Sequence, residues 1–126
     1  MAQAIITEKG REKLCKAHAG DIVLPKITHM VLGSGGVDEQ GEVKTPTGKE
    51  TELHEQKIKK ALSDHSFPIP TTCRYTMKLE KNELANEYIS EQGLVDSDGD
   101  LVAYKTFLPK GKDEDMEFVF SMDEIF

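Results

Sequence analysis

The chain has 126 residues, 37% of them hydrophobic and 31% charged, so it is long enough for one globular domain and too apolar for full disorder. Its 23 acidic and 16 basic residues give a formal charge of -7, which disfavours a nucleic acid partner because an acidic surface repels phosphate groups. Its apolar runs are too short for a membrane span or a signal peptide, so we expect one cytosolic domain over residues 1–126.

The first predicted element is a helix over residues 8–19. Thr7 can cap it through the side-chain oxygen, and Gly20 can supply the left-handed residue that ends it. The expected buried stripe is only weakly apolar and consists of Leu14, Cys15, Ala17 and His18. A strand over residues 27–32 follows, because its side chains alternate in a way that suits a strand covered on both faces.

The middle of the chain has weaker patterns. Residues 33–49 are rich in glycine, threonine and charge and have no periodicity, which predicts a long loop or mobile flap. Residues 50–63 are predicted to be helical, because Ile58, Ala61 and Leu62 fit one helical face. The two prolines within residues 67–70 predict an extended segment without ladder hydrogen bonds on that side.

Clear strand patterns occupy the last third of the chain. Residues 72–79 alternate with Cys73, Tyr75, Met77 and Leu79 on one face. A hairpin is predicted around the turn at residues 96–100, and a last strand has Met116, Phe118, Phe120 and Met122 on one face. The sequence therefore predicts an α+β fold in which an N-terminal helix packs on a mainly antiparallel β-sheet.

The turn residues Asp96, Asp98 and Asp100 alternate like the first ligands of an EF-hand calcium loop. Gly99, however, is fourth where that loop needs its glycine sixth, and Phe107 holds the twelfth position, which requires glutamate. We therefore predict a plain hairpin turn and no metal site.

The other candidate sites lack the spacing that their chemistry requires. Gly33-Ser34-Gly35-Gly36 follows a strand, but no helix and no P-loop lysine come after it, so a flexible turn is expected. Cys15 and Cys73 form no CxxC pair and are expected to be buried apolar side chains. The histidines show no zinc-binding spacing, and they are His18, His29, His54 and His65.

Two of these histidines have a more specific prediction. His29 alternates within an apolar strand and is expected to be a hydrogen-bonded core residue. Ser63-Asp64-His65-Ser66 has the residue types of a catalytic triad, but they are contiguous before prolines, which predicts a solvated turn. We therefore expect no catalytic residue, no cofactor and no enzyme activity.

Two blocks of the sequence resemble the phage tail-collar fibre protein family. The first is Ile6-Thr7-Glu8-Lys9-Gly10-Arg11 together with the strand and glycines of residues 26–35. The second, residues 89–103, is similar to the family's I-x-E-x-G-L-x-D-x-x-G-x-L-x-A hairpin and is the more specific match. Its motif positions here are Ile89, Glu91, Gly93, Leu94, Asp96, Gly99 and Leu101.

The residue types of this hairpin motif suggest structural roles. Gly93 and Gly99 are expected to permit tight turns, and Glu91 is expected to accept hydrogen bonds at the hairpin base. Leu94 and Leu101 are expected to pack against each other across the hairpin.

The resemblance implies a domain at the proximal end of a tail fibre, which attaches the fibre to the baseplate and precedes a trimeric shaft. Residues 1–126 show no shaft and no receptor-binding tip, so we expect an attachment or assembly module that acts by protein–protein contacts. The expected partners are other tail and baseplate proteins and further copies of the chain, with a trimer as first choice. The expected location is the bacterial cytoplasm during assembly and then the virion tail.

Two other functions stay open on the residues alone. One is a small cytosolic hydrolase or metal-dependent enzyme built from His29, His65, Cys73 and the aspartates of residues 96–100, and the other is a regulatory binding protein of the host cytosol.

For an interface, the exposed candidates are residues 33–48 and a C-terminal strand whose apolar residues include Phe120, Met122, Ile125 and Phe126. The alternative is that this strand completes the monomer's own sheet.

Overall fold

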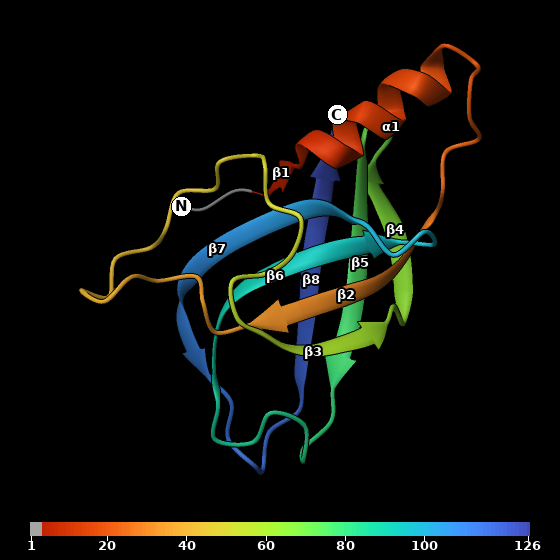
Figure 1. Ribbon diagram of the computed structural model, residues 1–126. Helices are drawn as coiled ribbons and strands as arrows, with labels where there is room; N and C mark the ends of the chain where they lie inside the picture. Colours follow the sequence, from red (N-terminus) through yellow and green to blue (C-terminus); the bar gives the residue numbers. More distant parts are fainter. Residues whose placement is uncertain (1–3) are drawn as a thin grey trace.

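The computed structural model describes residues 4–126 and consists of two antiparallel β-sheets and one short helix (Figure 1). Strands hold 48% of the residues and the helix 9%, so the protein is mainly β, which is broadly compatible with the predicted α+β class. The elements in chain order are β1 (Ile5–Ile6), α1 (Glu8–His18), β2 (Ile27–Gly33), β3 (Gln56–Ala61), β4 (Asp64–Ile69), β5 (Thr72–Leu79), β6 (Tyr88–Asp96), β7 (Leu101–Gly111) and β8 (Phe118–Ile125).

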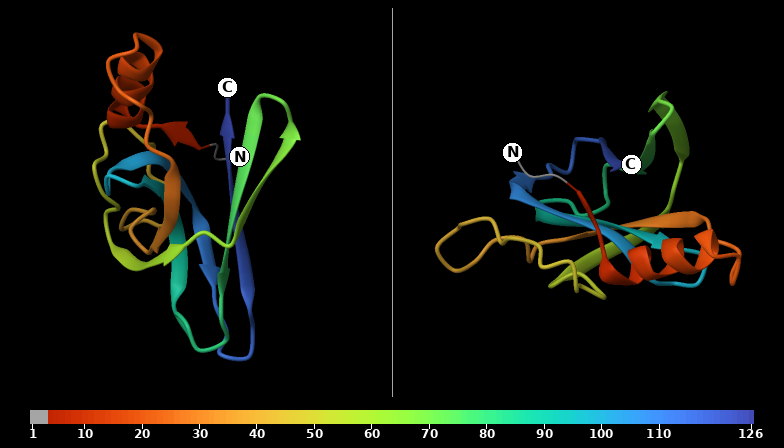
Figure 2. Two further views of the ribbon diagram at one scale, coloured as in Figure 1. Left: turned by 90° about the vertical axis from the view of Figure 1, so that its right-hand side faces the viewer. Right: turned by 90° about the horizontal axis from the view of Figure 1, so that it is seen from above.

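The main core lies between the two sheets, whose strands run across one another (Figures 1 and 2). One sheet has the order β1-β7-β6-β2-β3 and the other the order β4-β5-β8. Both contribute to the core, whose buried residues are Met30, Leu32, Met77, Leu79, Ile89, Leu94, Val102, Ala103, Phe120 and Met122. A second cluster consists of Val31, Leu53, Val95, Leu101 and Tyr104. Neighbouring residues of β2 belong to different clusters, so both faces of that strand are covered, as predicted.

Helix α1 begins and ends at the predicted signals. The Thr7 side chain accepts a hydrogen bond from the Gly10 amide, and Gly20 has a φ of 85°. The predicted buried stripe is wrong, because only Gly10 and Lys13 of the helix are buried, whereas Cys15 and His18 are exposed. Burial of Cys15 was therefore predicted wrongly too, while Cys73 is buried as expected. The helix buries a small residue and an ion-paired lysine in place of an apolar stripe.

The predicted loop after β2 is confirmed and extends to β3. It contains one isolated bridge between Val37 and Val43. The helix predicted over residues 50–63 is wrong, because β3 forms there and pairs with β2. Ile58 and Lys60 are half-buried between exposed neighbours, which is the alternation of a strand at the edge of a sheet.

Residues 67–69 are extended as predicted, whereas Pro70 belongs to the turn that follows. The expected lack of ladder pairing is wrong for Ile69, which pairs with Thr72, but Phe67 and Pro68 have no partner in the register. Strand β4 pairs with β5 as an edge strand, and its register shifts between Ser66 and Ile69, where Pro68 lies. This is the sheet position that tolerates proline. The predicted strand β5 and the β6–β7 hairpin are both confirmed.

The C-terminal strand β8 completes the protein's own three-stranded sheet by pairing with β5 along its whole length. Phe120 and Met122 are buried in the main core, so the expectation that they leave exposed apolar surface is wrong. Ile125 and Phe126 are exposed, and Met116 is exposed outside the strand. None of the described residues belongs to a helix that is long and apolar enough to cross a membrane.

Candidate functional site

The turn between β6 and β7 is organised by the buried side chain of Asp96. Its Oδ1 atom accepts hydrogen bonds from the amides of Asp98 at 3.0 Å and Asp100 at 3.1 Å. The Gly99 amide donates to the Asp96 carbonyl, and Gly99 has a φ of 87°, which favours glycine. The predicted hairpin turn and the turn role of Gly99 are thus confirmed.

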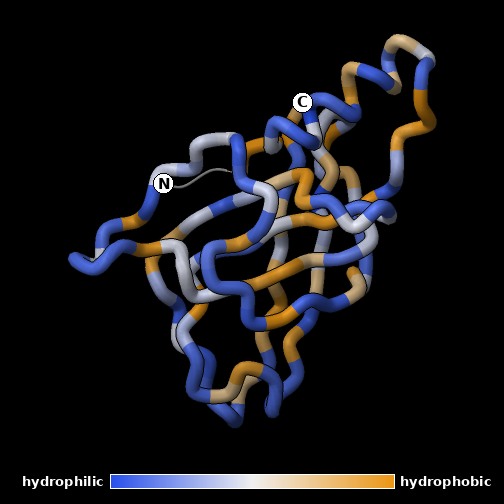
Figure 3. The backbone as a smooth tube through the Cα atoms, viewed as in Figure 1, coloured by the Kyte–Doolittle hydropathy of each residue, from blue (hydrophilic) through white to orange (hydrophobic). Residues whose placement is uncertain are grey.

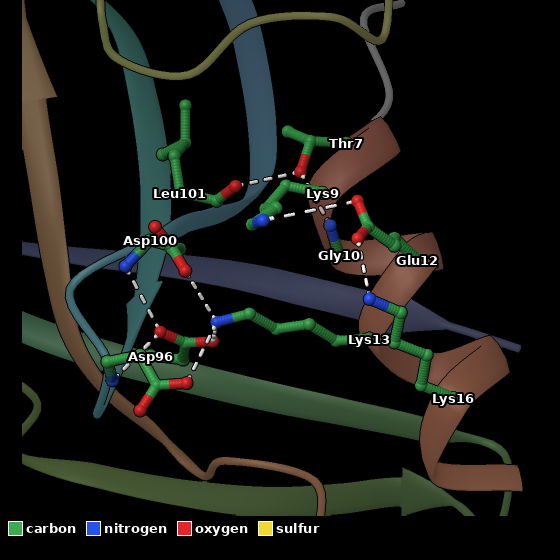
Figure 4. A network of polar contacts seen from close by, with 10 residues as sticks. Thr7, Lys9, Gly10, Glu12, Lys13, Lys16, Asp96, Asp100 and Leu101 are labelled. Carbon is green, nitrogen blue, oxygen red and sulfur yellow. Dashed lines mark hydrogen bonds and ion pairs between the residues drawn. The ribbon is translucent and has the colours of Figure 1, made fainter. Parts of the chain in front are cut away.

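Lys13 of helix α1 directs its ammonium group into this turn (Figure 4). Its Nζ atom lies 2.6 Å from Asp96 Oδ2, 3.2 Å from Asp98 Oδ2 and 2.7 Å from Asp100 Oδ2. Oxygens of the three carboxylates lie within 4.8 Å of one another, as ligands of a cation do. The lysine ammonium is therefore the cation that this aspartate cluster binds within the chain.

The ion pairs change the acidity of the groups that form them. Burial lowers the pKa of Lys13, but the hydrogen bonds to Asp100, Asp96 and Asp98 outweigh burial and raise the pKa above its usual value. The hydrogen bond from Lys13 lowers the pKa of Asp100. Both shifts favour the charged pair, so the contact between α1 and the hairpin persists at neutral pH.

The start of helix α1 is attached to the same hairpin by hydrogen bonds (Figure 4). Thr7 Oγ1 donates to the Leu101 carbonyl at 2.7 Å, and the Thr7 amide donates to the Val102 carbonyl at 3.0 Å. A Cβ atom at Gly10 would lie 2.6 Å from the Val102 carbonyl oxygen, which is closer than real Cβ contacts. Glycine is therefore required where the helix meets β7.

Glu91 on β6 binds the long loop to the five-stranded sheet. It is 0% exposed, and its carboxylate accepts four hydrogen bonds of 2.7 to 2.9 Å. The donors are the amides of Gly35, His54 and Glu55 and the hydroxyl of Tyr104. Burial, together with the charge and hydrogen bond of Glu91, raises the pKa of Tyr104. The predicted role of Glu91 as an acceptor at the hairpin base is confirmed.

The glycine segment after β2 is buried and tightly packed, so its interpretation as a flexible turn is wrong. A Cβ atom would contact the Glu55 carbonyl from Gly33 and the Ser90 carbonyl from Gly36 at distances that force a shift. The Gly36 amide donates to Ser90 Oγ at 2.9 Å. These glycines allow close backbone approach, and the first part of the proposed 33–48 interface is consequently covered by the chain itself.

Two expectations for the hairpin motif are wrong. Gly93 is in the middle of β6, and a Cβ atom there would collide with the Leu101 side chain, so it serves packing and makes no turn. Leu94 and Leu101 belong to different core clusters. The register shift between Leu94 and Val95 places Leu101 opposite Val95. Ile89 and Leu94 are buried in the main core.

The residues of the alternative enzyme hypothesis are only partly brought together. His65, Cys73 and Asp96 line one cavity, whereas His29 is hydrogen-bonded to Thr28 outside it. His29 is half-buried and hydrogen-bonded, close to its predicted role. Residues 63–66 are exposed as predicted, but they form no turn, because strand β4 begins at Asp64 and pairs with β5. His65 packs edge-on against Phe67 of the same strand.

The two blocks that carry the family resemblance therefore contact each other through helix α1 and the hairpin. The family described as phage tail-collar fibre protein, N-terminal, matches residues 1–117. The chain belongs to this family. No match was found among curated proteins or solved structures. The tail-collar fibre family is structural and is not known as enzymatic, so the protein is a bacteriophage tail structural protein of the virion tail.

Sequence reasoning missed Lys13, which carries the contact between helix and turn in this tail-collar fibre domain. A signal was present, because three alternating carboxylates in one turn attract a cation and Lys13 follows Gly10 by three residues, which places both on one side of the helix. The buried Lys112 was missed as well. Its Nζ atom donates to the Lys81 carbonyl at 2.8 Å and ties two loops together at the other end of the molecule.

Proposed function

We propose that this domain attaches a tail fibre to the baseplate, or assists its assembly there, through protein–protein contacts alone. The family match over residues 1–117 carries the proposal. The expected partners are other tail and baseplate proteins, in the bacterial cytoplasm during assembly and then in the virion.

The polar groups of the hairpin support a structural role. Lys13 and Asp96 neutralise each other, and Glu91 is saturated by four donors of its own chain. Groups that bind one another in this way hold elements in place. We infer that α1 packs on the β6–β7 hairpin and that residues 1–126 act as one domain. A rigid domain of this kind suits an attachment role.

Further copies of the chain are the second kind of partner that we propose, with a trimer as the first choice. Ile125 and Phe126 remain exposed at the end of β8 and are available for such contacts. We expect no nucleic acid or membrane partner, because the formal charge of -7 opposes phosphate surfaces.

Binding to the purified tail and baseplate proteins of the same phage tests the attachment role. Size-exclusion chromatography with light scattering should show a discrete complex with at least one of them. The Lys13→Met variant should be measured beside the wild type. It removes the ion pair between α1 and the hairpin and should therefore weaken the complex. If every tail protein elutes separately from the folded chain, the attachment role is wrong.

A further inference from the structure

Residues of helix α1, of the β4–β5 hairpin and of the C-terminus line one groove. Figure 2 shows these elements at the same end of the molecule. It has a volume of about 440 Å³, and its apolar wall residues include Leu24, Phe67, Tyr75, Val102 and Phe126. We call this cavity the end groove. An apolar cavity of roughly 150 Å³ holds a benzene molecule, so the end groove has room for two or three aliphatic side chains.

Exposed apolar side chains gather on the segments that line the end groove. Among residues 4–126, seven of the eleven exposed large apolar residues lie on these segments. They are Ile22, Val23, Leu24, Phe67, Ile69, Ile125 and Phe126. Three of them, Leu24, Phe67 and Phe126, line the end groove itself. Exposed apolar residues at a groove are typical of a protein interaction surface.

The connector between α1 and β2 carries exposed apolar side chains that could enter a groove. Ile22, Val23 and Leu24 are three successive exposed apolar residues, and Val23 is 93% exposed. Figure 3 shows the connector as an apolar segment that extends beyond the end of the helix. Leu24 also lines the end groove, so the connector and the groove form one continuous surface. In a symmetric assembly the same surface of each copy can contribute to the contact, so one apolar surface can serve both partners.

The charges around the end groove allow a second copy to approach. Its charged lining residues are Lys13, Lys26, Asp96 and Glu124, so the two signs are balanced although the whole chain has a charge of -7. The connector itself has Asp21 before its apolar residues and Lys26 after them. Asp21 of one copy can thus pair with Lys26 of another at the edge of the contact.

We propose that the Ile22–Leu24 connector of one copy docks into the end groove of a second copy of this chain. The proposal deepens the homo-oligomer part of the proposed function and rests on it. A head-to-tail contact of this kind forms a ring when its rotation closes, and a ring of three copies is the trimer that we give as first choice.

Light scattering of the purified chain over a range of concentrations tests the proposal. The wild-type mass should exceed the 14.1 kDa of one chain. Val23→Asp places a charge in the apolar contact and should raise the dissociation constant by at least about tenfold. Phe67→Ser changes the groove wall and should have the same effect. Val119→Asp is the matched control, because Val119 is 67% exposed at the opposite end of β8 and should leave the assembly intact.

A thermal melt of each variant shows that it is folded before its mass is compared. An assembly that Val23→Asp and Phe67→Ser dissociate while Val119→Asp does not supports the contact. A wild-type chain that is monomeric at every concentration overturns it, as does an assembly that responds equally to Val23→Asp and Val119→Asp. A monomer that still binds a tail protein overturns this contact and leaves the attachment role standing.

Discussion

The ammonium of Lys13 on α1 lies 2.6 Å from the carboxylate of Asp96 on β6, and the two residues are 83 positions apart in the chain. Both side chains are buried, so their attraction offsets the cost of removing two charges from water. This pair joins helix α1 to the β6–β7 hairpin, which carries the more specific part of the family resemblance.

Replacing Lys13 with methionine should lower the free energy of unfolding by about 3 kcal/mol, because it leaves the Asp96 carboxylate buried without its cation. Urea denaturation measures the change. Lys9→Met is the control, since the Lys9–Glu12 pair is exposed at 4.0 Å and should contribute less than about 0.5 kcal/mol. Equal stability of the two variants would show that the buried pair contributes nothing.

Millimolar calcium should leave the melting temperature of the wild-type protein unchanged, because the Lys13 ammonium lies among the three aspartates. In Lys13→Ala the same carboxylates lose their cation, and calcium should raise the melting temperature, since a ligand of the folded state stabilises it. Saturable stabilisation of the wild type that disappears on Asp98→Ala would contradict the prediction of no calcium site.

Glu91→Gln should lower the free energy of unfolding by about 2 to 3 kcal/mol, because the amide cannot accept from all four donors that the carboxylate now binds. Hydrogen exchange should become faster at the Gly35 and Glu55 amides, which donate to Glu91. Glu87→Gln is the control, since that side chain is exposed. Unchanged exchange at both amides in Glu91→Gln would show that Glu91 does not hold the loop.

The stability of the protein should depend on pH through Glu124. Burial in the end groove raises its pKa above the usual 4.5, and the hydrogen bond from Tyr75 offsets only part of this shift. The folded state therefore binds a proton more strongly than the unfolded state does, and stability falls as the pH rises from 4.5 through the raised pKa. Glu124→Gln should thus raise the melting temperature at pH 7 relative to wild type, and this gain should shrink below pH 4.5. A gain that is independent of pH would contradict the raised pKa.

Local alternation and capping in the sequence were enough to predict β2, β5, the β6–β7 hairpin and the start of α1. Strand β3 was missed because its lysines leave only Ile58 and Ala61 as apolar residues, and these also fit a helical face. The buried side of α1 was missed because helix patterns are sought among apolar residues, and here a glycine and an ion-paired lysine are buried.

The sequence was enough to predict the role of a residue where the chemical character of that one side chain decides the role. Glu91 was expected to accept hydrogen bonds at the hairpin base, and a carboxylate can act only as an acceptor when it is ionised. The pairing of Leu101 with Val95 was not, because it depends on a register shift that the sequence does not reveal. The contact between Lys13 and Asp96 depends on bringing together segments that are distant in the chain.

Electron cryo-microscopy of the phage particle that contains this chain tests its assignment as an attachment module most directly. The two-sheet domain should fit density at the point where the tail fibre meets the baseplate, in a number of copies that is a multiple of three. Density at the fibre attachment that excludes this fold, or its location elsewhere in the particle, would contradict the assignment.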